Sequence, residues 1–130
     1  HPPPPPSIYN RPVFIKSYHN TYLSAHPNSG KVTLSPNMQS WEEWTIIPLG
    51  GGKVAFKSPW NKYLSGSWTK AVSQANHLKG WEKWTEKRVN GKYAFMSHHK
   101  THLRADSKGF PNLTKTIDTW EEWTIIPKRR

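Results

Sequence analysis

A tryptophan followed directly by a glutamate occurs three times in this chain of 130 residues, at nearly equal spacing. A flat aromatic face can stack on the C–H groups of a sugar ring, and a neighbouring carboxylate can accept hydrogen bonds from the sugar hydroxyls. The pattern therefore predicts up to three shallow saccharide sites. The alternative is that each tryptophan only seals a barrel while its glutamate pairs with a lysine. The three pairs are Trp41 and Glu42, Trp81 and Glu82, and Trp120 and Glu121.

These pairs belong to a longer internal repeat. The stretch WEEWTIIP at residues 41–48 recurs unchanged at residues 120–127, and a degenerate copy, WEKWTEKR, occupies residues 81–88. A period of about 40 residues is typical of a repeated structural unit. We therefore divide the chain into three copies, which are residues 12–51, 52–90 and 91–130.

Other side chains near the first tryptophan of each copy extend the predicted sites. Asn37 and Asn76 precede that tryptophan by four and five residues, so their amides are predicted to hydrogen-bond the same ligand. The third copy reads Thr-Lys-Thr at residues 114–116 and has no asparagine there, which predicts an altered third site. Trp60 and Trp68 occur in turn-like sequence, where we expect either an exposed anchor or packing over a loop.

Each copy is predicted to consist of strands. No copy shows the apolar spacing of an amphipathic helix, whereas β-branched and aromatic residues cluster in short runs between Gly, Pro and Asn. The expected order is a first strand, a polar turn, a second strand with a leucine, a variable segment and a closing W-E-x-W-T strand. The first strands contain Val13-Phe14-Ile15, Val54-Ala55-Phe56 and Tyr93-Ala94-Phe95, and the second strands contain Leu23, Leu64 and Leu103.

Side chains alternate along a strand, so the two tryptophans of each closing strand are predicted to face different ways. The second tryptophan of each copy is assigned to the core, because large aromatic side chains are mostly buried. These residues are Trp44, Trp84 and Trp123. The predicted fold is all-β, a closed threefold barrel of roughly twelve short strands, since closure removes the sheet edges and a propeller needs at least four blades.

The predicted domain organisation is simple. Residues 12–130 are long enough to form a single domain with its own core. Residues 1–11 open with five consecutive prolines, which favour an extended conformation that cannot join a sheet, and they are predicted to be a tail or linker. No apolar run approaches the length of a membrane-spanning helix, so no membrane span is predicted.

The order V-x-[FI]-x-S, a polar turn with Y-L-S-A or Y-L-S-G, and W-E-x-W-T resembles the fascin-like β-trefoil superfamily over residues 12–127. The actin-binding proteins that the chain resembles in this superfamily are fascin and hisactophilin. The chain also resembles carbohydrate-binding modules of the same fold. The resemblance implies a β-trefoil, with either of these two functions. The chain differs from fascin in having one trefoil rather than a tandem, and from hisactophilin in having only seven histidines.

The net charge of +11 is unevenly placed. Residues 12–51 carry two basic and two acidic side chains, residues 52–90 carry eight and two, and residues 91–130 carry eight and four. A basic face favours association with polyanions or acidic surfaces. The absence of cysteine excludes a disulfide framework and thiolate chemistry.

No combination of residues predicts catalysis. The adjacent acids Glu42 and Glu43 would alternate across a strand and could not face one cleft as a glycosidase pair does. The densest group of imidazoles, His98, His99 and His102, is interpreted as solvated rather than metal-bound. We therefore predict neither enzymatic activity, nor a metal, nor a cofactor.

The leading hypothesis is a non-enzymatic carbohydrate-binding module or lectin for a polysaccharide such as a β-glucan, with avidity from several weak sites. It implies a secreted, monomeric protein whose proline-rich start acts as a spacer. One alternative is a cytoplasmic protein that binds or bundles filamentous actin. A second alternative is binding of sulfated glycan or nucleic acid through the basic second and third copies.

Overall fold

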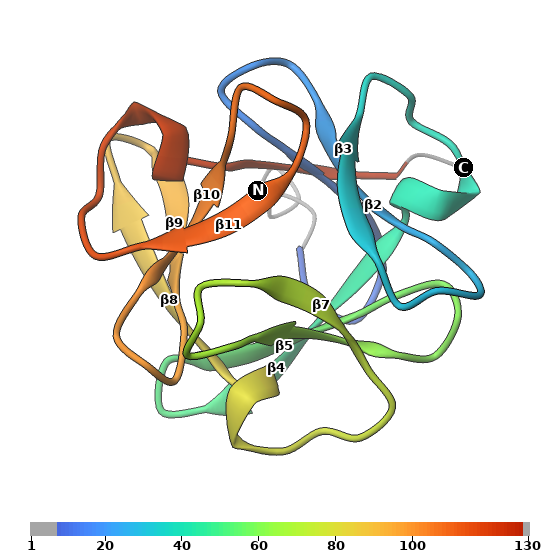
Figure 1. Cartoon of the computed structure of the whole chain (residues 1–130), viewed down its shortest axis with the longest axis horizontal. Helices are drawn as coiled ribbons and strands as arrows, with labels where there is room; N and C mark the ends of the chain where they lie inside the picture. Colours follow the sequence, from blue (N-terminus) through green and yellow to red (C-terminus); the bar gives the residue numbers. More distant parts are fainter. Residues whose placement is uncertain (1–7, 129–130) are drawn as a thin grey trace, which may run out of the picture.

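The computed structural model describes residues 8–128, which form short strands and three one-turn helices (Figure 1). The twelve strands of this part are β1 (Pro12–Lys16), β2 (Tyr22–Ala25), β3 (Val32–Ser35), β4 (Trp44–Gly50), β5 (Lys53–Lys57), β6 (Tyr63–Gly66), β7 (Val72–Ala75), β8 (Trp84–Val89), β9 (Lys92–Met96), β10 (His102–Ala105), β11 (Pro111–Thr114) and β12 (Thr124–Pro127). The 3-10 helices are η1 (Ser40–Glu42), η2 (Gly80–Glu82) and η3 (Thr119–Glu121). The prediction of an all-β protein is confirmed.

Six strands pair antiparallel in a nearly closed barrel. Strand β1 pairs with both β12 and β4, and the ladder continues through β5 and β8 to β9. An isolated bridge between Tyr93 in β9 and Trp123, the residue before β12, brings the two ends of this ladder together. Few sheet edges are therefore left open.

The other six strands form three hairpins, β2–β3, β6–β7 and β10–β11. Strands β3, β7 and β11 contact one another and surround the centre of the view in Figure 1. Backbone hydrogen bonds join the hairpins, from Leu34 N–H to the Gly109 carbonyl and from Gln74 N–H to the Gly30 carbonyl, both at 2.9 Å. Backbone hydrogen bonds, and not only side-chain packing, therefore hold the hairpins together.

The core contains the second tryptophan of each copy, as predicted. All three are fully buried, and each indole N–H donates to the carbonyl of the leucine in the second strand of its own copy. The bonds run from Trp44 to Leu23 at 2.9 Å, from Trp84 to Leu64 at 3.0 Å and from Trp123 to Leu103 at 3.0 Å. A buried indole N–H needs such a partner, so these bonds fix each ring in one orientation.

The predicted first and second strands are also confirmed. Val13, Phe14 and Ile15 lie in β1 and are all buried. Val13 and Ile15 belong to the core, and Phe14 packs against Tyr22 of β2. The equivalent runs lie in β5 and β9, and the three leucines lie in β2, β6 and β10. Between β4 and β5 the chain reverses through three glycines with positive φ, at Gly50, Gly51 and Gly52, a conformation that other residues rarely adopt.

The segment before β1 is only partly described, because residues 1–7 of the predicted tail lie outside the described residues. Its described part packs on the barrel. Asn10 N–H donates to the Ile46 carbonyl at 2.8 Å, and the Tyr9 hydroxyl donates to Glu86 Oε1 at 2.7 Å. Burial, together with the Glu86 bond, raises the pKa of Tyr9 to about 12.

Among the described residues, the molecule has no helix with the length and apolar character needed to cross a membrane.

Candidate functional site

The first tryptophan and its glutamate lie in the 3-10 helices η1, η2 and η3, and not in the closing strand. The prediction that W-E-x-W-T is one continuous strand is therefore wrong. In the first two copies the closing strand begins only at the second tryptophan, at Trp44 and Trp84. The alternation of a strand does not determine where the first tryptophan points, because the chain turns between the two tryptophans.

Each glutamate is buried and holds its own turn in place. Glu42 is 3% exposed, its Oε1 accepts the Gln39 N–H at 2.9 Å, and its Oε2 accepts the Ser24 hydroxyl at 2.6 Å. Both carboxylate oxygens are thus engaged inside the protein, in charge-assisted bonds. The second copy repeats the arrangement, with bonds to Glu82 from Lys79 N–H at 2.8 Å and from the Ser65 hydroxyl at 2.6 Å.

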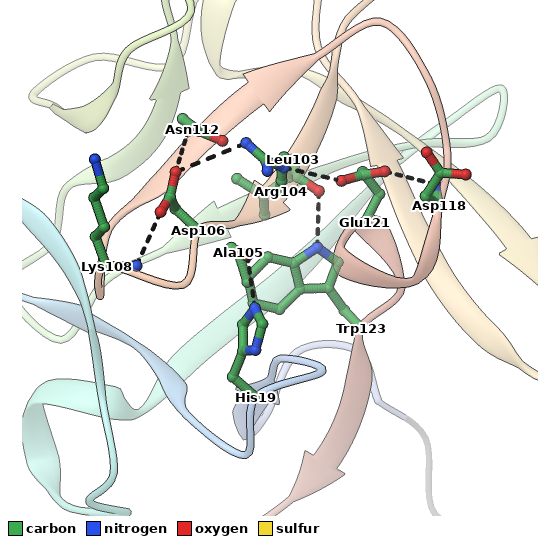
Figure 2. A network of polar contacts seen from close by, with 10 residues as sticks. All are labelled: His19, Leu103, Arg104, Ala105, Asp106, Lys108, Asn112, Asp118, Glu121 and Trp123. Atoms are coloured by element: carbon green, nitrogen blue, oxygen red, sulfur yellow. Dashed lines mark hydrogen bonds and ion pairs between the residues drawn. The ribbon is translucent and has the colours of Figure 1, made fainter.

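The third copy has an arginine where the first two have this serine (Figure 2). Arg104 Nε lies 3.5 Å from Glu121 Oε2, and Arg104 Nη1 lies 3.7 Å from Asp106 Oδ2. The Arg104 guanidinium also lies over the Trp120 ring, 4.7 Å from its centroid. Burial raises the pKa of the Glu121 carboxyl, although the Asp118 N–H and the Arg104 charge act against this rise.

The first tryptophans are partly exposed. Trp41 is 39% exposed and Trp81 is 40% exposed, while Trp120 is half-buried. Trp41 and Trp81 are therefore more accessible to a ligand than Trp120. Figure 1 shows the three helices that carry them, η1, η2 and η3, apart from one another around the edge of the molecule.

Each first tryptophan packs edge-on against a ring from the polar turn of another copy. The ring centroids are 6.5 Å apart for Trp41 and Trp60, 5.0 Å for Trp81 and His99, and 4.7 Å for Trp120 and His19. Two of the partner rings are anchored in turn, by bonds from Trp60 Nε1 to the Ala25 carbonyl at 2.8 Å and between His19 Nε2 and the Ala105 carbonyl at 3.1 Å. His99 Nε2 is buried without a hydrogen-bond partner among the described residues.

A hollow lies beside each first tryptophan. The first pocket, beside Trp41, has a volume of about 380 Å³ and is lined by hydroxyl and amide side chains that include Ser35, Asn37 and Gln39, together with His26. The second pocket, beside Trp81, has a volume of about 640 Å³ and is lined by Asn76, His77, Lys79 and His98. The third pocket, beside Trp120, has a volume of about 530 Å³ and is lined by Arg104, Asp118 and three threonines.

Both predicted asparagines line these pockets, but they are not equivalent. The hairpin register pairs Tyr22 with Ser35 and Tyr63 with Ala75, so Asn37 lies two residues beyond its hairpin and Asn76 only one. The structural counterpart of Asn37 in the second copy is therefore His77. The segments that run from Ser35 to Trp41 and from Ala75 to Trp81 have the same length, so the two asparagines occupy different positions in them.

The sequence analysis named Trp60 but did not predict that the rings of the polar turns pack against the first tryptophans, or that serines bond the glutamates. A signal for the rings exists, since the turns YHNT, PWNK and HHKT all have an aromatic or imidazole side chain at their second position. These positions are His19, Trp60 and His99. Ser24 and Ser65 both follow a leucine in the sequence. This shared position does not predict a hydrogen bond to a glutamate 18 or 17 residues away.

The imidazole group of the third copy is not uniformly solvated. His98 is exposed and His99 half-buried, but His102 is buried, so interpreting all three as solvated is wrong for His102. Its Nε2 lies 3.1 Å from Lys87 Nζ, and burial together with the Lys87 charge lowers the His102 pKa. Within residues 8–128, no three His, Asp or Glu side chains are arranged to hold a metal ion.

No protein-family model matches this chain, and no curated protein matches it. The three pockets are therefore interpreted from their own geometry and chemistry.

Proposed function

We propose that this protein is a fascin-like β-trefoil that binds carbohydrate without catalysing a reaction. The observation that carries the proposal is the recurrence of a partly exposed tryptophan beside an open, polar hollow, at Trp41 and again at Trp81. The β-trefoil assignment is supported by three hairpins set on a six-stranded barrel and by the same buried bond from tryptophan to leucine in each copy.

The tryptophan and the glutamate have different tasks in this proposal. The tryptophan ring offers the face on which a sugar stacks, and the hydroxyl and amide groups of Ser35, Asn37 and Gln39 bond the sugar hydroxyls in the first pocket. The Glu42 carboxylate already has a partner for each oxygen, so its task is to hold the turn that presents Trp41. Fixed positioning of the ring lowers the entropy lost on binding.

Binding by one pocket alone is expected to be weak. The pockets are open hollows that cover only part of a sugar, whereas tight small-molecule sites bury most of their ligand. Two or more pockets on one rigid domain gain affinity for a repeating polymer when the spacing of the polymer allows simultaneous contact. A polysaccharide such as a β-glucan is therefore a better ligand than a monosaccharide.

The third pocket is expected to contribute least. The Arg104 guanidinium already covers one face of Trp120 at 4.7 Å, and that tryptophan is less exposed than Trp41 or Trp81. A sugar would have to displace a cation that two carboxylates also hold. The first and second pockets are thus the main sites.

The test is retention of the purified protein on insoluble β-glucan, chitin and cellulose, beside filamentous actin, each at low and moderate salt. Retention on at least one polysaccharide should persist at moderate salt and should be lost in the Trp41→Ala, Trp81→Ala double variant. Trp68→Ala is the matched control, because Trp68 is 70% exposed and lies in a hairpin turn outside the three pockets.

The same experiment tests the two alternatives. Retention on actin alone would replace the carbohydrate proposal with an actin-binding function. Retention that disappears as salt rises, and that the tryptophan double variant leaves intact, would indicate polyanion binding through the basic second and third copies.

A further inference from the structure

The second pocket differs from the other two in its charged side chains. His77 and Lys79 line it from the segment between β7 and η2, and His98 lines it from the turn between β9 and β10. All three side chains belong to exposed residues. They are therefore available to a ligand that enters the hollow beside Trp81.

No carboxylate that lines this pocket in the described part of the chain pairs with the Lys79 ammonium group. The one carboxylate among the described lining residues is Glu82, which is buried and accepts hydrogen bonds from the Ser65 hydroxyl and the Lys79 backbone N–H. The Lys79 ammonium group is in no ion pair among the described residues. A positive charge at the edge of a hollow attracts an anionic ligand.

The pocket is also shaped so that His98 reaches it. Gly80 is the first residue of η2, and a Cβ atom at that position would lie 3.7 Å from His98 Cε1 and Nδ1. The missing side chain keeps the space between η2 and the imidazole open. The first and third copies have Ser40 and Thr119 at this position of their helices.

The first pocket lacks this cationic character. Its lining is mainly hydroxyl and amide side chains, and its one imidazole, His26, is hydrogen-bonded through Nε2 to Thr33 Oγ1 at 3.1 Å. The His26 ring also lies 5.1 Å from the Trp41 ring. This lining suits a neutral sugar, whose hydroxyl groups both donate and accept hydrogen bonds.

The third pocket has a cation, but its charge is balanced. Arg104 is in ion pairs with Asp106 and Glu121, and Asp118 adds a further carboxylate to the lining. A ligand anion would have to compete with these carboxylates for the guanidinium. The three pockets therefore differ in charge even though each contains a tryptophan and a glutamate.

We infer that the second pocket binds an anionic saccharide, whose ring stacks on Trp81 and whose carboxylate or sulfate is bound by Lys79, His77 and His98. This inference rests on the proposed carbohydrate-binding function and adds the ligand class of one pocket. The first pocket, which lacks these side chains, has no such preference for an anion. A polymer that alternates neutral and acidic sugars could then engage both pockets.

The experiment measures affinity by titration calorimetry at neutral pH and at one ionic strength near 0.15 M, to limit unspecific attraction. The probes are polygalacturonate beside its neutral methyl ester, and dextran sulfate beside dextran. Each pair shares a backbone and differs in charge, and the two pairs distinguish carboxylate from sulfate as the preferred group. The wild-type protein should bind at least one anionic probe about fivefold or more tightly than its neutral partner.

Three variants locate the effect. The triple variant His77→Gln, Lys79→Gln, His98→Gln should lose the preference for the anionic probe, and Trp81→Ala should lose binding of that probe. Trp68→Ala, at an exposed turn residue outside the three pockets, should leave the preference unchanged. The three glutamine substitutions are at exposed positions, and a thermal unfolding curve checks that the triple variant is folded.

The outcomes separate this inference from the proposed function. Binding of neutral probes through Trp41 with no charge preference would overturn the inference and leave the carbohydrate function intact. A charge preference that survives Trp81→Ala would overturn the inference in favour of unspecific attraction to the basic surface. No binding of any probe, or of the insoluble polysaccharides, would overturn both.

Discussion

The Ser24 hydroxyl donates a 2.6 Å hydrogen bond to the buried carboxylate of Glu42. This bond joins strand β2 to helix η1 and satisfies a charge that would otherwise be buried with one partner fewer. We expect Ser24→Ala to lower the free energy of unfolding by about 1–3 kcal/mol, the usual effect of leaving a buried polar group unpaired. Urea denaturation measures the change. Ser29→Ala, at an exposed turn residue, is the control and should change it by less than about 0.5 kcal/mol.

Gly66 should not tolerate alanine, although alanine occupies the same place in the other two copies, at Ala25 and Ala105. A Cβ atom at Gly66 would lie 3.0 Å from Trp84 Cη2 and 3.2 Å from Ser97 Cβ. These atoms belong to buried side chains that cannot easily move, so we expect Gly66→Ala to destabilise the protein by about 1–3 kcal/mol.

A matched control for this substitution is Gly80→Ala, whose Cβ would make only ordinary contacts at 3.7 Å. Thermal or urea unfolding of both variants checks the prediction. Equal stability of the two variants would show that the space around Gly66 can relax.

The buried histidine predicts a loss of stability in mild acid. Burial and the Lys87 charge lower the His102 pKa below its ordinary value of 6.5. Between the folded-state pKa and 6.5, the unfolded chain therefore binds more protons than the folded one. Stability should therefore be fully present above pH 6.5 and should fall as the pH drops from 6.5 towards the folded-state pKa. Denaturant midpoints measured between pH 7.5 and pH 5 test this.

The control for the pH experiment is His102→Tyr, because tyrosine stands at the corresponding positions Tyr22 and Tyr63. This variant should lose the part of the pH dependence that comes from residue 102. An unchanged slope in the variant would assign the acid sensitivity to other groups.

Arg104→Ser should activate the third pocket. The substitution gives Glu121 the serine partner that Glu42 and Glu82 have, and it removes the cation that lies over Trp120. In a Trp41→Ala, Trp81→Ala background, where the third pocket is the remaining candidate, we expect the Arg104→Ser change to increase retention on the polysaccharide ligand. Binding that stays absent would show that Trp120 is too buried to act.

Those parts of the fold that depend on local sequence pattern were predictable. Short runs of β-branched and aromatic residues between turn residues predicted β1, β5 and β9, and the size of Trp44 predicted its burial. The helix η1 was not predictable in this way. It forms because Glu42 bonds both the nearby Gln39 N–H and the distant Ser24 hydroxyl. The residue pattern of a strand does not indicate that second contact.

The candidate site was predictable in its aromatic part and not in its polar part. Trp41 and Trp81 lie at open pockets, as their repeated position suggested, but their glutamates are turned inward. Part of the polar lining comes from other segments of the chain. His98 reaches the second pocket from the turn between β9 and β10, and no spacing rule within one copy could have connected it to Trp81.

The pairing of β1 with β12 allows a circular permutation of the chain. Lys128 N–H donates to the Pro12 carbonyl at 3.0 Å, so the outermost strands of the barrel run side by side and a short linker could join them. The chain could then be opened at the exposed turn that contains Gly51, where a Cβ atom on Gly51 would have no contact within 4 Å. A circularly permuted protein of this kind would retain the same strand pairings, with the second copy as the start of the chain.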